Sequence, residues 1–298
     1  MKKIIVGLAE TDGSRDALWL GKRFAEAEGA QLHVVVVLSS GTSAVSVQEY
    51  EQLRQRHFDH VFEIATDELG TGYTPHHLDG ISAAAGLTTI AEEIDADAIV
   101  IGSSRHGPIG RVLIGDVGSR LSAEAPCSVI VAPRGFARRE HASFSRIGVG
   151  YDGTPESETA LAGAVGMAQE FNGSLVLIGV VPHLLTPGRI GGTDLGYERL
   201  LREEMDERLE AASAIDEVEV ACTLRVGDTA DELADASTDL DLLVLGSRGY
   251  GPLRRVLLGG VCAKLMRSSA CPVVVLPRGS EKGPERHQVM ATLAPFTA

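Results

Sequence analysis

Two loops in the second half of the chain carry residue types that can bind a phosphorylated ligand. The earlier loop, G-Y-D-G-T, contains Asp152, whose carboxylate could accept hydrogen bonds from a ribose or from the amino group of adenine. Gly153 lets the chain pass close to a ring, and Thr154 completes the loop. The chemistry expected of this loop is recognition of a nucleotide.

The later loop, G-S-R-G-Y-G, contributes small and polar residues that suit phosphate oxygens. Gly246, Gly249 and Gly251 have no Cβ atom, so their backbone N–H groups can come close to an anion. Ser247 adds a hydroxyl donor and Arg248 adds positive charge. Turns of this composition also join strands to helices without binding a ligand, so the glycines alone do not establish a phosphate site.

A helix is expected to begin at Gly259-Gly260, with Val261 in its first turn. Its N-terminus would direct partial positive charge at the same anion. No G-K-[ST] follows the glycines, so the segment is not a P-loop. We therefore expect these three residues to complete a phosphate site that depends on backbone N–H groups.

These loops belong to one of two copies of the same unit. A shift of 144 residues places Gly246 on Gly102 and Cys271 on Cys127, and a shift of 143 aligns the openings of the two halves. About half of the positions in residues 95–135 are identical under the first shift. The chain is therefore a tandem duplication.

Short β-branched segments alternate with segments of helical periodicity in both halves, which predicts a parallel sheet with helical crossovers. The expected strands are Ile4–Leu8, Leu32–Leu38, Ile99–Ile101, Ser128–Ala132, Ile147–Val149, Leu175–Val181, Val218–Leu224, Leu242–Leu245 and Val273–Leu276. The sequence thus predicts two α/β domains, residues 1–135 and 145–279, and a tail at 280–298.

Composition excludes several classes of protein. The formal net charge is −14 and no basic stripe is present, which argues against nucleic-acid binding. No segment approaches the roughly eighteen apolar residues that a membrane span needs. The four cysteines form no C-x-x-C pair and have apolar flanks, which predicts buried free thiols and a reducing cytoplasm.

The combination of these features resembles the universal stress protein family. It consists of the duplicated α/β half, the D-G-T loop and the G-x-x-G-x₉-G spacing of Gly246, Gly249 and Gly259. The segments A-P-C-S-V-I-V at 125–131 and A-C-P-V-V-V at 270–275 are similar to the last strand of that family. The resemblance covers nearly the whole chain, as a tandem pair.

The resemblance implies a fold and a ligand. Each half would form a five-stranded parallel sheet of order 3-2-1-4-5, with helices on both faces, as in other adenine-nucleotide-binding α/β folds. ATP, with or without Mg²⁺, would bind in the crevice between the first and fourth strands. Asp152 would contact the adenosine part, and Gly246, Gly249 and Gly259 would line the phosphates.

The family also implies that two such domains pair through their final strands. Residues 129–131 and 273–275 could pair within one chain, which would make the chain an intrachain pseudo-dimer. An apolar edge strand left exposed would invite unwanted association. Pairing of two chains as a homodimer is a further possibility.

Two residues depart from the pattern of that family. The family has Ser or Thr directly after the last motif glycine, where this chain has Gly260, and Cys262 stands where a second hydroxyl is usual. Two side-chain donors to phosphate are therefore missing, while the backbone N–H groups remain. We expect ATP binding in the second half with weaker contacts to the phosphates.

The first half has different loop residues. The segment T-D-G-S at 11–14 looks like a nucleotide loop, but the alignment of the halves places Asp152 on Ala9. We therefore interpret T-D-G-S as the start of a helix, capped by Asp12 or Ser14. A single local gap in the alignment would restore the nucleotide interpretation.

The phosphate loop of the first half is altered as well. Arg105 replaces a glycine, and Asp116 places a carboxylate at a helix N-terminus, where it would repel an anion. Our hypothesis is that Asp116 occupies the phosphate position and pairs with Arg105. The alternative is that both side chains lie in solvent. Either way, the first half is expected to hold a degenerate site.

Other residues give weaker indications. His76-His77 could suggest a metal, but adjacent side chains point apart and we expect a surface loop there. Asp228, in V-G-D-T, could serve a Mg²⁺ site. The helix expected at 197–212 should have one face in the core. No G-x-S-x-G elbow or Ser-His-Asp set can be assembled from the sequence.

Three functions are compatible with these features. The first is a regulatory module that senses or stores ATP in a stress response, with no catalytic base and at most slow hydrolysis. The second is an enzyme, an ATPase or an adenylate-forming relative, which would need an acidic Mg²⁺ site beside the glycines. The third is an interaction scaffold without a nucleotide, which Gly260 favours. Asp152 and the intact glycine spacing favour the first function.

Overall fold

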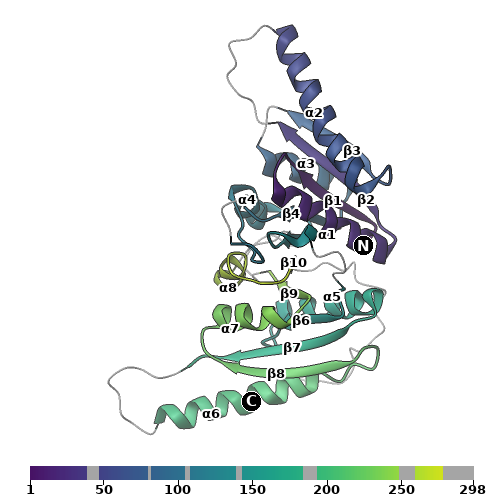
Figure 1. The fold of residues 1–298 in the computed structure, drawn as a ribbon. Helices are drawn as coiled ribbons and strands as arrows, with labels where there is room; N and C mark the ends of the chain where they lie inside the picture. Colours follow the sequence, from purple (N-terminus) through teal and green to yellow (C-terminus); the bar gives the residue numbers. More distant parts are fainter. Residues whose placement is uncertain are drawn as a thin grey trace.

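The structure is a computed structural model that confirms the predicted α/β class (Figure 1). It describes residues 1–38, 47–79, 82–104, 108–138, 143–183, 193–247 and 259–277. The strands are β1 (Lys3–Leu8), β2 (Gln31–Leu38), β3 (Thr74–Asp79), β4 (Ala98–Gly102), β5 (Ser128–Ala132), β6 (Arg146–Gly150), β7 (Ser174–Val181), β8 (Val220–Val226), β9 (Leu242–Gly246) and β10 (Val273–Leu276).

Helices connect these strands. They are α1 (Asp12–Glu28), α2 (Val47–Leu69), α3 (Ala83–Ile94), α4 (Asp116–Glu124), α5 (Pro155–Phe171), α6 (Thr193–Ala212), α7 (Thr229–Ala236) and α8 (Gly260–Leu265), with short 3₁₀ turns η1 (Phe136–Arg138) and η2 (Ser237–Asp239). Within the described ranges, no helix is both long enough and apolar enough to cross a membrane.

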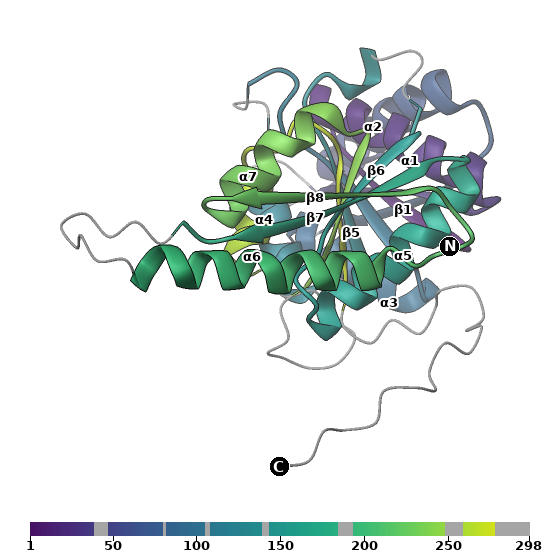
Figure 2. The ribbon, with the colours of Figure 1, turned by 90° about the horizontal axis from the view of Figure 1, so that it is seen from below.

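The strands form one sheet in the order β3-β2-β1-β4-β5-β10-β9-β6-β7-β8. Each half therefore has the predicted order 3-2-1-4-5, and the strands within each half pair in parallel. Figure 1 shows the strands stacked along the long axis of the molecule, and Figure 2 shows the twist of the sheet along that axis. The strand order reverses between β1 and β4 and between β6 and β9, where open α/β sheets bind ligands.

The two halves join at the centre of the sheet. β5 and β10 pair antiparallel, with Val131 opposite Val273 and Ile130 opposite Val274. All four side chains are fully buried. The structure thus pairs the segments 129–131 and 273–275, and the pairing covers the edge that each final strand would otherwise expose.

Two hydrophobic layers cover the two faces of the sheet. One layer contains buried side chains of α1, α2, α5 and α6, and the other contains those of α3, α4, α7 and α8. In the first layer Phe144 lies between Phe24 of α1 and Phe171 of α5, with ring centroids 5.4 Å and 4.6 Å apart. Each layer is continuous across both halves, so the halves share their core.

The sequence patterns gave no strand at residues 74–79, and the prediction of a surface loop for His76 and His77 is wrong. Both residues lie in β3, an edge strand with mostly exposed residues, so no apolar alternation marks it. Their side chains do point apart. His76 Nε2 lies 2.9 Å from Nδ1 of His33, and the ring of His77 packs 4.6 Å from that of Phe58. Burial lowers the pKa of His33 and of His76.

One prediction of burial is wrong at the other edge of the sheet, and the prediction that the helix there has one face in the core is confirmed. Cys222, on the outermost strand β8, is exposed, whereas Cys127, Cys262 and Cys271 are buried as predicted. On α6, Leu209 is buried but Leu200 is 61% exposed. Glu198, which lies nearer the N-terminus of α6, is buried together with Leu209, so Leu200 lies off the covered face of the helix.

Candidate functional site

The loops after β6 and β9 meet at the carboxyl edge of the second half. The two strands are neighbours, with Val149 opposite Val244. A Cβ atom on Gly246 would overlap the carbonyl oxygen of Glu156 and lie 3.0 Å from its Cβ. The end of β9 therefore touches the first turn of the helix that follows Asp152. The strand order thus brings the two predicted loops together.

The Asp152 loop is held by its own hydrogen bonds. Oδ1 of Asp152 accepts from the backbone N–H of Thr154 at 3.0 Å and from its hydroxyl at 2.6 Å. Gly153 has φ +77°, a left-handed conformation that favours glycine. Thr154 then caps α5 by accepting from the N–H of Ser157 at 3.3 Å. These hydrogen bonds therefore hold the exposed carboxylate of Asp152 in place just after β6.

Arg208, which the sequence analysis did not select, covers this loop. It projects from α6, and its Nη1 donates to the carbonyl oxygen of Asp152 at 2.8 Å. Its Nη2 also pairs with Glu204 on the same helix, at 2.5 Å. No local pattern distinguishes Arg208 from the other Arg and Glu residues of α6, because the contact joins residues 56 positions apart.

Gly246 and Ser247 differ in what they offer a ligand. The overlap with α5 gives Gly246 a packing reason to be glycine, independent of any phosphate. Ser247 is 2% exposed, and its hydroxyl has no hydrogen-bond partner among the described residues. The equivalent hydroxyl of Ser103 donates to Ala132 O at 2.7 Å and accepts from Leu113 N at 3.1 Å. Within the part of the chain that the structure describes, the hydroxyl of Ser247 therefore has no counterpart to these two hydrogen bonds.

The helix at the end of the phosphate loop begins where the sequence predicts. Gly259 is the N-cap of α8, with no side-chain cap, and Gly260 is its exposed first residue. Val261 follows in the first turn. The Sγ of Cys262 points inward, 3.5 Å from Gly246 O, and burial raises its pKa to about 11. Cys262 is therefore part of the core rather than a substitute phosphate donor.

Three predicted site residues, Arg248, Gly249 and Gly251, lie outside the described residues.

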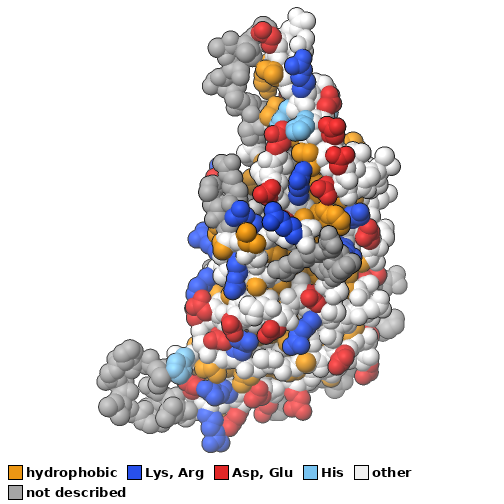
Figure 3. Space-filling view, in the orientation of Figure 1, with side chains coloured by type: hydrophobic (Ala, Val, Ile, Leu, Met, Phe, Trp, Pro, Cys, Tyr) orange, Lys and Arg blue, Asp and Glu red, His pale blue; other side chains and the backbone are white. Residues whose placement is uncertain are grey.

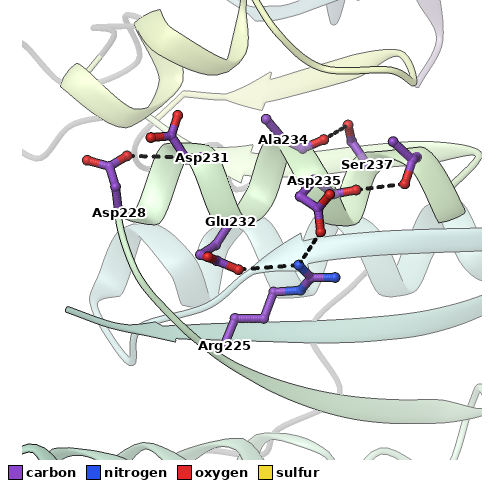
Figure 4. A network of polar contacts seen from close by, with 8 residues as sticks. Arg225, Asp228, Asp231, Glu232, Ala234, Asp235 and Ser237 are labelled. Carbon is purple, nitrogen blue, oxygen red and sulfur yellow. Dashed lines mark hydrogen bonds and ion pairs between the residues drawn. The ribbon is translucent and has the colours of Figure 1, made fainter. Parts of the chain in front are cut away.

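Asp228, the candidate Mg²⁺ ligand, caps α7 by accepting from the N–H groups of Ala230 and Asp231, both at 3.1 Å (Figure 4). Lys264 Nζ lies 3.0 Å from Asp228 and lowers the pKa of its carboxyl. These contacts give Asp228 a structural role that links α7 to α8.

Thr11, rather than Asp12 or Ser14, caps the first helix. Its hydroxyl accepts from Ser14 N at 3.2 Å, as Thr154 does in the second half. Asp12 comes one residue later, in the first turn, and the hydroxyl of Ser14 accepts from Ala9 N at 3.1 Å. The predicted cap residues were therefore wrong, but the equivalent caps confirm the alignment that places Asp152 on Ala9.

The first half has a hollow of about 250 Å³ at the position equivalent to the Asp152 loop. Glu10 and Asp12 line it together with Arg15, so two carboxylates face any ligand there. On the opposite side of the crevice, α4 begins with the exposed Asp116 after the uncapped Gly115. The pairing of Asp116 with Arg105 stays a prediction, because Arg105 lies outside the described residues.

Comparison with known proteins gives a consistent result. The sequence model of the universal stress protein family matches residues 1–133 and 143–277. A universal stress protein of Mycobacterium tuberculosis is 29% identical over 210 residues, which cover 68% of this chain and 71% of the relative. Another from Mycolicibacterium smegmatis is 28% identical over 250 residues, covering 82% and 83%.

A solved structure agrees in fold. A universal stress protein from Archaeoglobus fulgidus superposes with a TM-score of 0.67 at 18% sequence identity, covering 93% of this chain and 98% of that chain. At this identity the likeness shows the architecture and leaves the ligand open.

Proposed function

Because the chain belongs to the universal stress protein family, we propose that it is a regulatory module of a stress response that binds ATP in its second half. The observation that carries the proposal is the position of Asp152 and Ser247 after neighbouring strands at the reversal of strand order, where the buried hydroxyl of Ser247 has no partner among the described residues. A buried hydroxyl without a partner costs free energy that a ligand oxygen would recover.

The proposed pose follows from the two loops. Asp152 and Gly153 contact the adenosine part, and the phosphates lie near Ser247 and the N-terminus of α8. Gly260 leaves the backbone N–H groups of α8 open and adds no hydroxyl.

The first half is not proposed to bind ATP in the same way. The alignment leaves Ala9 where the second half has Asp152, and Glu10 and Asp12 line the equivalent hollow. Asp116 adds a third carboxylate at the helix N-terminus. A triphosphate would meet like charge at both ends of this crevice, which opposes binding.

Asp152→Ala is expected to weaken ATP binding by about tenfold to a hundredfold, the usual range for a hydrogen bond to a charged group. Isothermal titration calorimetry of the purified chain with ATP would measure the change and the number of sites. Asp12→Ala, the matched substitution in the first half, is expected to leave the affinity of the second-half site unchanged. A chain that binds no ATP at all would favour a nucleotide-free interaction scaffold.

Asp152→Asn separates ligand contact from loop folding. The amide keeps the Oδ1 acceptor for Thr154, so the turn is retained, but it replaces Oδ2 by a donor. If Asp152 contacts the adenosine part, both Asn and Ala variants bind ATP weakly. If only the Ala variant binds weakly, Asp152 acts through the loop, and its proposed contact with ATP is wrong.

Gly260→Ser is expected to strengthen ATP binding by about threefold to tenfold, because it adds one hydroxyl donor at the start of α8. A Cβ at Gly260 would meet no atom within 4 Å, so the side chain fits without strain. Calorimetry would be run in parallel on Gly260→Ala, which adds the Cβ without the hydroxyl. Equal affinities for the Ser and Ala variants would show that the phosphates do not lie at Gly260.

A further inference from the structure

A cleft of about 460 Å³ lies in the first half between α1 and the segment that follows β5. Arg15 and Trp19 line it from α1, and Arg134 and Arg138 line it from the opposite wall. Ile109, from the loop after β4, also lines it. The volume falls within the range of small-molecule sites.

Hydrogen bonds fix the walls of this cleft. Asp16 is 2% exposed, and its two carboxylate oxygens accept from the N–H groups of Gly135 and Ala137, each at 2.8 Å. Gly110 N donates to Arg134 O at 2.8 Å, which ties the loop after β4 to the same wall. The cleft is therefore formed by the fold and needs no rearrangement to exist.

Three guanidinium groups and three carboxylates line the cleft, so its formal charges balance in a chain whose net charge is −14. Two of the carboxylates already have partners within the protein, and Asp16 is one of them, because it accepts the two backbone N–H groups described above. Glu68 accepts from Trp19 Nε1 at 2.9 Å and lies 3.8 Å from Arg15 Nε. Asp12 is the remaining carboxylate on the lining. Figure 3 shows Lys and Arg side chains over the middle of the molecule, around α1, with Asp, Glu and hydrophobic side chains among them.

Apolar surface lies beside these charges. Ile109 is 71% exposed, one of only four large hydrophobic side chains that are exposed in the described part of the chain. Trp19 is half-buried, and Nζ of Lys22 lies over its ring, 5.2 Å from the ring centroid. Arginine beside an aromatic ring recognises flat groups by stacking and anions by paired hydrogen bonds.

The sequence of the second half does not repeat the residues that line the cleft from α1 and α2. The alignment that superposes the two helix caps places Glu158 on Arg15, Ala162 on Trp19 and Ala211 on Glu68. The guanidinium group of Arg15, the ring of Trp19 and the carboxylate of Glu68 therefore occur only in the first half. This half is the one that the proposed ATP site does not use.

We propose that this cleft binds a small organic anion that carries a flat ring, such as an aryl phosphate or an aryl carboxylate. The guanidinium groups of Arg15 and Arg138 hold the anionic group, and the ring lies against Trp19 and Ile109. This site is separate from the ATP site proposed above and involves none of its residues.

Trp19 is the only tryptophan of the chain, so it reports on this cleft alone. Phenyl phosphate would be titrated into the Asp152→Ala chain, with Trp19 fluorescence and the single indole N–H resonance as readouts. Saturable binding is expected with a dissociation constant on the order of 1 mM or tighter, as for a fragment of this size. Benzoate is expected to compete, whereas inorganic phosphate and phenol are expected to bind at least about tenfold more weakly.

Arg138→Ala is expected to weaken the binding of phenyl phosphate by about tenfold, and Arg15→Ala is expected to weaken it by a similar factor. Arg199→Ala, an exposed arginine of the second half, is the control and should bind as the parent does. The proposal is overturned if no saturable change occurs, if Arg138→Ala and Arg199→Ala bind equally, or if inorganic phosphate binds as tightly as phenyl phosphate. Because the Asp152→Ala background removes the ATP contact, failure here leaves the proposed ATP site untouched.

Discussion

Gly102→Ala is expected to lower the free energy of unfolding by about 3 kcal/mol, the upper part of the range for overpacking a core. A Cβ at this position would overlap the carbonyl oxygen of Gly13 and lie 2.9 Å from its Cα. Both of these atoms belong to the backbone of the first turn of α1, and Gly102 itself ends β4. Neither element can withdraw, because both are packed in the core. Urea unfolding followed by circular dichroism would measure the loss.

The matched control for this variant is Gly260→Ala. It also adds a methyl group at a glycine, here the first residue of α8, but nothing lies within 4 Å of the new atom. The expected change in stability is within about 0.5 kcal/mol, as for most surface substitutions. If Gly102→Ala proved as harmless as this control, the close approach of β4 and α1 would be wrong.

The same contact changes how the glycines of the second half should be interpreted. Gly246, the counterpart of Gly102, approaches Glu156 of α5 in the same way. Loss of ATP binding in a Gly246 variant would therefore report a displaced loop and would not prove a phosphate contact. Asp152 and Gly260 are better probes, because both are exposed and their replacements need not disturb the packing.

Much of the fold could be predicted because its signals are local and repeated. Strands such as β4 and β9 are short, apolar and buried, and each has a counterpart in the other half of the duplication. The strand order then predicted that the loops after β6 and β9 would meet. β3 could not be predicted in this way, because an edge strand with exposed residues has no apolar alternation.

The site could be predicted less completely, since some of its contacts join distant parts of the chain. Arg208 reaches the Asp152 loop from α6, and no spacing in the sequence indicates this. Arg134 and Arg138 look like part of a charged linker until Asp16 fixes that segment beside α1. Thr11 was missed as a cap because Asp12 and Ser14 are equally good candidates by residue type.

The junction between the halves supports a second large effect. Val274→Asp is expected to lower the free energy of unfolding by at least about 4 kcal/mol, because it buries a carboxylate without a partner. Val274 is fully buried and pairs with Ile130 of the first half and Val244 of the second. Hydrogen exchange measured by mass spectrometry would follow the protection of β5 and β10 separately.

Protection is expected to fall in both strands, although the substitution changes only the second half. The two halves form one packed unit, because β5 pairs with β10 and phenylalanine contacts join α1 to α5. A loss of protection in β10 should therefore extend to β5 across the junction. Ala221→Asp, on the exposed edge strand β8, is the matched control and should leave the protection of β5 unchanged. If Val274→Asp exposed β10 while β5 kept its protection, the two halves would be independent folding units that share an edge but not their stability.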